Sequence, residues 1–90
     1  ASAAPRVQTR DYGDAIRRVV RETTGAPPKT VRFVSTEEGF VVYVVVPLDP
    51  EISLSEAHKL ASEIEQRVHR KYPGIKRMVI HTEPGSPARQ

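Results

Sequence analysis

The sequence contains no cysteine and no tryptophan, and it has no long hydrophobic run. Without cysteine, the chain has no disulfide, no thiolate zinc site and no cysteine nucleophile. The longest apolar run, residues 40–46, is far shorter than the roughly 20 residues that a membrane-spanning helix needs. The chain begins with alanine rather than methionine, so membrane spans elsewhere in a longer protein are not excluded.

Motifs of catalysis are also missing from the sequence. It has no glycine-rich loop that would hold a phosphate, no nucleophile elbow and no pair of carboxylates spaced for acid–base catalysis. We therefore expect that the protein is not an enzyme.

The residues that are present suit one small domain. Hydrophobic residues make up 38% of the 90 residues and charged residues 28%, a balance typical of a soluble domain with a modest core. The net charge of +3 permits an acidic partner without requiring one. Residues 1–10 lack apolar periodicity and residues 85–90 contain Gly, Ser and Pro, so we expect flexible tails on either side of a domain over residues 11–84.

Hydrophobic periodicity predicts the first three elements of secondary structure. Apolar residues at helical spacing predict a helix over residues 12–24, with Asp11 as its N-cap. Two strands follow over residues 30–35 and 40–46. Gly39 in the short connection between them favours a hairpin, because glycine accepts a positive φ.

The second helix has the clearest signals. Ser53 and Glu56 fit a capping box at its start, and Pro73 with Gly74 ends it. A last strand over residues 77–83 follows. The order helix-strand-strand-helix-strand predicts an α+β fold, a two-layer sandwich of the ferredoxin-like, split α-β type with a three-stranded sheet.

The second strand is apolar on both of its faces, which indicates that both faces are covered. Its residues divide by alternation into two sets: Phe40, Val42, Val44 and Val46 on one face, and Val41, Tyr43 and Val45 on the other. Two helices can cover one face of a small sheet, and a second copy of the chain is the simplest cover for the other. The alternative is that Tyr43 and Val45 are half-exposed residues that merely favour a strand.

Three histidines and their acidic neighbours are candidates for metal binding. His81 and Glu83 are two residues apart on a strand, so their side chains leave the same face and together suit zinc, although such a pair also occurs at ordinary polar strand ends. His58 and His69 lie about three helical turns apart and point in nearly the same direction. For Glu65 and His69, a solvated helix edge is the favoured interpretation.

A basic segment over residues 67–71, continued by Lys76 and Arg77, is long enough to contact phosphates. Glu63 and Glu65 interrupt the same helix, and the strands carry no aromatic pattern of an RNA-binding sheet. A solvated helix end is the favoured interpretation, and no nucleic-acid partner is expected.

From Leu48 to Pro84 the sequence resembles the cytoplasmic C-terminal domain of cation diffusion facilitator (cation efflux) transporters. The matching pieces are Asp49-Pro50, Ile52-Ser53-Leu54-Ser55-Glu56-Ala57-His58, Ile64-Glu65, Tyr72-Pro73-Gly74 and Val79-Ile80-His81-Thr82-Glu83-Pro84. In that family the domain follows six transmembrane helices, dimerises and binds zinc or related divalent ions, and the metal draws two copies together and tunes transport.

The resemblance implies a dimerising, metal-responsive regulatory domain of a divalent-cation efflux transporter. The implied partners are a second copy, the transmembrane part of the parent transporter and divalent cations. The implied location is the cytoplasmic side of a membrane, with the piece itself soluble. Two alternatives stay open: a free-standing dimeric module of the same fold that has lost metal binding, and a small RNA-binding α+β domain.

The resemblance also implies a set of metal ligands. By position, His58, His81 and Glu83 correspond to ligands of the family, and a divalent ion, zinc in the first place, is the implied cofactor. Two positions depart from the family: Val45 stands where a histidine is expected, and Lys29 or Thr30 stands where another is expected. A closed zinc site needs about four donors, so the three that remain bind across a dimer, bind weakly with water, or no longer bind.

Overall fold

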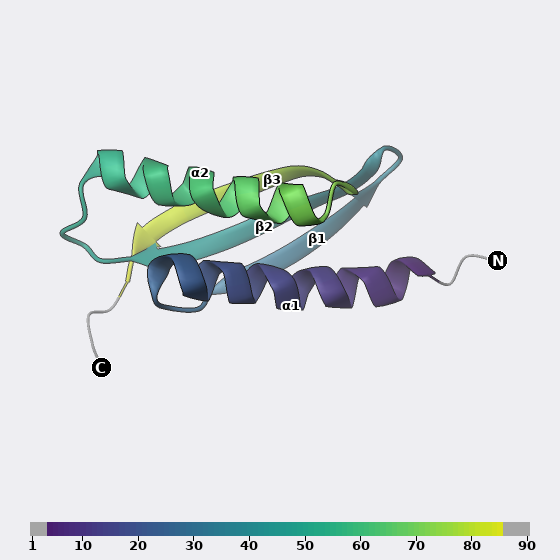
Figure 1. Ribbon diagram of the computed structural model, residues 1–90, viewed down its shortest axis with the longest axis horizontal. Coiled ribbons are helices and arrows are strands. Elements are labelled where there is room, and N and C mark those ends of the chain that lie inside the picture. Colours follow the sequence, from purple (N-terminus) through teal and green to yellow (C-terminus); the bar gives the residue numbers. More distant parts are fainter. Residues whose placement is uncertain (1–3, 86–90) are drawn as a thin grey trace.

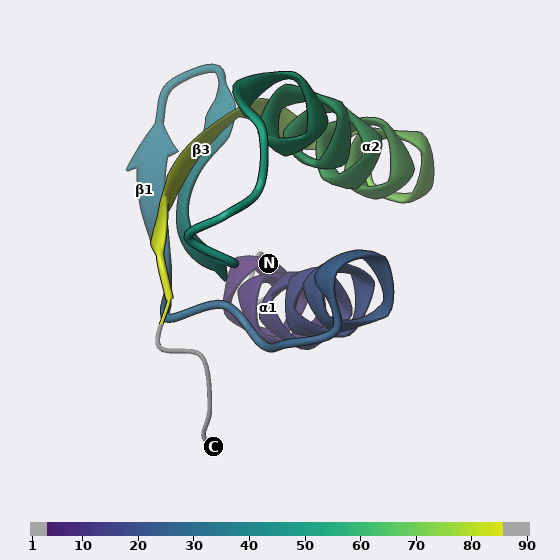
Figure 2. The ribbon, with the colours of Figure 1, turned by 90° about the vertical axis from the view of Figure 1, so that its left-hand side faces the viewer.

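The structure, a computed structural model, describes residues 4–85, so parts of both predicted tails, residues 1–3 and 86–90, lie outside it. The elements are α1 (Ala4–Thr24), β1 (Thr30–Thr36), β2 (Gly39–Leu48), α2 (Leu54–Lys71) and β3 (Ile75–Pro84). The sheet has the order β1-β2-β3, with β1 antiparallel and β3 parallel to β2. Both helices pack on one side of the sheet (Figures 1 and 2), which confirms the predicted two-layer α+β fold.

The first helix begins earlier than predicted, at Ala4 rather than at Tyr12. The prediction of an irregular tail is therefore wrong for residues 4–10, and Asp11 lies inside the helix instead of capping it. Pro5 stands in the first turn, where its fixed φ suits a helix and its missing N–H would have had no partner. The sequence misled because apolar residues are too sparse before Tyr12 to show a helical period.

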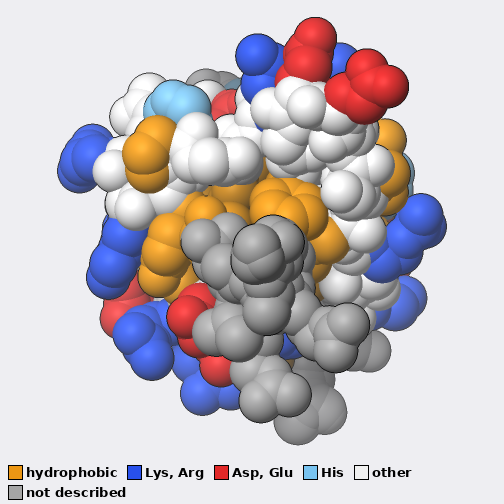
Figure 3. Space-filling view, turned by 90° about the vertical axis from the view of Figure 1, so that its right-hand side faces the viewer, with side chains coloured by type: hydrophobic (Ala, Val, Ile, Leu, Met, Phe, Trp, Pro, Cys, Tyr) orange, Lys and Arg blue, Asp and Glu red, His pale blue; other side chains and the backbone are white. Residues whose placement is uncertain are grey.

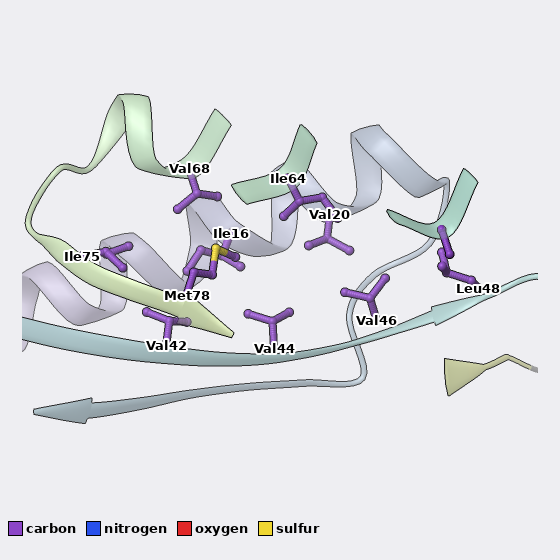
Figure 4. Packing of buried hydrophobic residues seen from close by; sticks show 11 residues of the cluster. Ile16, Val20, Val42, Val44, Val46, Leu48, Ile64, Val68, Ile75 and Met78 are labelled. Atoms are coloured by element: carbon purple, nitrogen blue, oxygen red, sulfur yellow. The ribbon is translucent and has the colours of Figure 1, made fainter. Parts of the chain in front are cut away.

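The core lies between the helices and the inner face of the sheet (Figure 4). One stripe of each helix enters it, and β2 contributes every second residue, as alternation requires. The members are Ile16 and Val20 from α1, Ala57, Ile64 and Val68 from α2, Val42, Val44, Val46 and Leu48 from β2, and Ile75 and Met78 from β3. Burying a Val or Ile of this kind stabilises the fold by about 1.5–3 kcal/mol. The predicted cover for one face of β2, that of Val42, Val44 and Val46, is therefore the two helices.

Local signals place the turns where the sequence predicts them. The Ser53 hydroxyl oxygen accepts a hydrogen bond from the Glu56 backbone N–H at 3.0 Å, so the predicted N-cap of α2 is confirmed. Gly39 has φ 137°, and β1 and β2 form the predicted hairpin. Because β2 runs away from the hairpin, α2 begins near the opposite end of the sheet from the hairpin. Neither helix in the described part of the chain is long and apolar enough to cross a bilayer.

Four aromatic rings close the hairpin end of the sandwich. The Tyr12 ring centroid lies 4.6 Å from that of Tyr72 and 6.3 Å from that of Phe40, and Phe33 lies 6.2 Å from Phe40. Figure 3 looks at this end and shows hydrophobic side chains gathered among charged ones. The hairpin end is therefore closed by apolar packing, whereas the polar residues of interest lie toward the opposite end.

Candidate metal centre and dimerisation surface

The face of the sheet that the helices leave bare, the outer sheet face, carries an apolar centre. Alternation and strand register place on it Arg32 and Val34 of β1, Val41, Tyr43 and Val45 of β2, and Arg77, Val79, His81 and Glu83 of β3. Tyr43 is 42% exposed and Val34 is 38% exposed, while Val41, Val45 and Val79 are half-buried. No described residue of the chain lies over these side chains as a second layer, so the outer half of the β2 pattern is uncovered within one copy (Figure 2).

Tyr43 has a cationic neighbour on the outer sheet face. Arg32 stands opposite it in the β1–β2 register, and the guanidinium carbon lies 5.7 Å from the centroid of the Tyr43 ring. A guanidinium at this distance is attracted to the π face of the ring. The apolar centre at Tyr43 therefore has a positively charged neighbour on the β1 side.

His81 and Glu83 lie at one end of the outer sheet face. In the parallel β2–β3 register His81 is opposite Val45, and Glu83 is opposite Pro47. His81 is exposed, and the Glu83 side chain is 32% exposed. The two side chains leave the same face of β3, so a nitrogen donor and an oxygen donor stand one step apart on the strand. Val45, between β1 and His81, supplies no donor.

Glu83 already has a cationic partner. Lys29 Nζ donates to Glu83 Oε1 at 3.3 Å, and the two residues are joined across the sheet from the start of β1 to the end of β3. The Lys29 backbone N–H donates to the Val45 carbonyl oxygen at 2.8 Å, which fixes the base of the lysine side chain against β2. The ammonium thus occupies the space beside the carboxylate that a bound cation would use.

His58 lies in the other layer, near the start of α2, and its side chain is exposed. Its neighbour Ala57 lines a shallow cavity of about 180 Å³ together with Thr82, Glu83 and Pro84. His58, His81 and Glu83 are therefore at the same end of the domain.

Proximity at one end of the domain does not make a metal site. In residues 4–85 no three His, Cys, Asp or Glu side chains come together in an arrangement that could hold a metal ion. One copy therefore brings together two of the three predicted donors, His81 and Glu83, and His58 is not grouped with them. The residues present fit a divalent ion only in part, and completion needs donors from outside this copy.

Two residues of the predicted basic segment, Arg67 and Lys76, have partners within the fold. Arg67 donates to Glu22 Oε1 at 2.7 Å and to the Thr23 hydroxyl at 3.1 Å, which ties α2 to α1. Lys76 Nζ lies 3.8 Å from Glu38 Oε1. These contacts give Arg67 and Lys76 partners within the fold, and no contact in the described residues favours the RNA-binding alternative.

The sequence of residues 11–85 matches the family described as "Cation efflux protein, cytoplasmic domain". The match covers most of the chain, from within α1 to the end of β3. The chain belongs to this family. A search of curated proteins found no match.

Solved structures share the fold of this cation efflux domain. The metal-bound C-terminal domain of the CzcD transporter from Thermotoga maritima is similar with a TM-score of 0.77 and 23% identity, over 90% of this chain and 96% of that one. A variant of the MamM C-terminal domain in a manganese form has a TM-score of 0.74 and 14% identity, over 86% and 99% of the two chains. Another MamM variant, in a cadmium form, has a TM-score of 0.76 and 15% identity, over 88% and 99%. At these identities the likeness shows the fold.

Sequence reasoning about the cation efflux domain missed the use of Lys29. It identified Lys29 as a residue that offers no donor to a metal, but not as the partner of Glu83. The signal that was available is the connection from β2 through α2 to β3, because a crossover of this length gives a parallel strand beside β2. That topology brings the start of β1 and the end of β3 to the same end of the sheet.

Proposed function

We propose that this chain is the dimerising, metal-responsive regulatory domain of a divalent-cation efflux transporter. The observation that carries the proposal is the outer sheet face, which combines an uncovered apolar centre with a His–Glu pair at one end. The family supplies the setting, since its description places the domain on the cytoplasmic side of a cation efflux protein.

The apolar centre supports pairing with a second copy. Tyr43, Val34 and their half-buried neighbours form a continuous group across all three strands. Such a group is more stable when it is removed from water, and a second copy related by a two-fold axis offers a matching surface. Sheet-to-sheet packing of this kind places β2 at the centre of the interface.

We propose that the metal ion binds in the dimer, because one copy alone offers too few donors. His81 and Glu83 provide two donors on the outer sheet face, and in the dimer water or a donor of the partner subunit completes the ligand set. A two-fold axis produces two such sites, so two ions bind per dimer. An ion that joins donors from both copies binds the dimer in preference to the single copy and thereby stabilises the dimer. Closure of the dimer then acts on the transmembrane part of the transporter.

Zinc titration followed by calorimetry and by sedimentation velocity tests this function. We expect wild type to bind about one Zn²⁺ per chain and to shift toward the dimer, and His81→Ala to lose both effects. His69→Ala is the matched control, because His69 is also exposed but lies in the second half of α2, on the helix face of the sheet. Identical heats for wild type and His81→Ala would remove the metal part, and a monomer with and without zinc would remove the dimer.

A further inference from the structure

Lys29 and Glu83 form a bridge over the end of the outer sheet face. Lys29 enters from the start of β1 and Glu83 stands near the end of β3, with β2 between them. The glutamate is the more sheltered member, with its side chain 32% exposed against 65% for the lysine. The bridge therefore has one anchored carboxylate and one long cationic side chain that can swing away.

The chain holds the base of this lysine firmly. Pro27 and Pro28 precede it and fix two φ angles, and its own N–H is bonded to the Val45 carbonyl oxygen at 2.8 Å. The four-carbon stem then lets the ammonium return to Glu83 whenever it leaves. A tethered ligand of this kind acts at a high effective concentration, in the millimolar range or above.

The Lys29 ammonium opposes the binding of a divalent ion to Glu83 in two ways. It must first displace Lys29 from the carboxylate oxygen. It then remains close to a positive charge that the tether prevents from leaving, and a double and a single charge repel each other appreciably at contact distance even in water. An exposed ion pair contributes little to stability, but as a competitor it weakens the binding of every cation at the same carboxylate.

We propose that Lys29 is a built-in competitor for the cation at Glu83 and sets the metal concentration at which the His81–Glu83 pair is occupied. This inference rests on the proposed metal-responsive function and assigns the regulation of its site. In the metal-free state the ammonium substitutes for the ion, and metal binding exchanges one cation for another. The domain therefore responds to a higher concentration of metal than the same donors would without the lysine.

The test removes the charge and keeps the length of the side chain. Lys29→Met is expected to tighten Zn²⁺ binding about tenfold in calorimetry of the whole chain, from the repulsion that is removed. Lys76→Met is the matched control. Lys76 also pairs with a glutamate, Glu38 at 3.8 Å, and its side chain is 58% exposed, but it lies seven residues from Glu83, about 23 Å along β3. Its removal should leave zinc affinity unchanged.

A second measurement separates competition from any change of structure. The gain of Lys29→Met over wild type should shrink in 1 M NaCl, where the Debye length falls to about 3 Å. A gain due to altered packing would persist at high salt, and would overturn the proposal.

The two proposals fail in distinguishable ways. Equal zinc affinity for wild type and Lys29→Met, with loss of binding in His81→Ala, overturns the role of Lys29 and leaves the metal function standing. No zinc binding in wild type, Lys29→Met or His81→Ala overturns both. A tighter Lys76→Met would also overturn the inference, because the effect would then come from total charge rather than from the bridge.

Discussion

Replacing Tyr43 by serine tests the outer sheet face as a dimer interface. Tyr43 is 42% exposed in one copy. A tyrosine of about 200 Å² thus leaves about 85 Å² to be buried, which at about 25 cal/mol per Å² amounts to about 2 kcal/mol. Each copy of a two-fold dimer contributes one Tyr43 to the interface, so the loss doubles. Tyr43→Ser should therefore weaken the dimer by about 4 kcal/mol, or about a thousandfold in dissociation constant.

Sedimentation equilibrium over a wide range of protein concentration measures this constant directly. The matched control is Val44→Ser, one residue further along the same strand. Val44 is 1% exposed and faces the helices, so its loss should lower the free energy of unfolding by about 2–4 kcal/mol. Tyr43→Ser should leave the thermal midpoint of the diluted monomer close to that of wild type, because its ring lies outside the core.

Two results would refute this reasoning. If Tyr43→Ser and wild type dimerise with the same constant, the interface lies on another face. If Tyr43→Ser melts as early as Val44→Ser, the ring stabilises the protomer itself and the separation of the two sheet faces is wrong. Serine at two neighbouring positions of β2 thus distinguishes an effect on dimer association from an effect on folding, since alternate side chains point to opposite faces.

Two further substitutions test how the fold positions these residues. Ser53→Ala removes the oxygen that accepts the Glu56 N–H and should lower the free energy of unfolding in urea by about 1 kcal/mol, whereas Ser55→Ala in the same turn should change it little; equal effects would contradict the cap. Gly39→Ala places a side chain at φ 137°, with its Cβ 3.2 Å from the Gly74 carbonyl oxygen, and should cost about 1–3 kcal/mol in the same assay, so an unchanged urea midpoint would contradict the need for glycine.

The fold was predictable from the sequence wherever several signals along one segment indicate the same element. In α2 the Ser53 cap, the apolar stripe and the Pro73-Gly74 end all indicate the same helix. In α1 the helix before Tyr12 has no apolar period, so nothing local distinguishes it from a tail. The rule that failed there is the use of periodicity alone to find a helix start.

The candidate site was predictable only within a strand. Alternation places His81 and Glu83 on one face, because that relation needs no knowledge of the rest of the fold. The ion pair between Lys29 and Glu83 joins residues from opposite edges of the sheet and depends on strand order. The separation of His58 from the pair likewise depends on which layer each element occupies. Side chains from different elements meet only after the topology is known.

In the proposed function, dimerisation and metal binding are coupled because both use the outer sheet face. If the ion binds the dimer and not the single copy, it stabilises the dimer in proportion to the logarithm of metal concentration over dissociation constant. The Tyr43 centre then sets how much dimer exists without metal, and Lys29 sets the metal concentration at which more dimer forms. A tenfold tighter site in Lys29→Met therefore moves the response to tenfold lower zinc, while Tyr43→Ser lowers the amount of dimer at every zinc concentration. The two residues control separate parameters of one equilibrium.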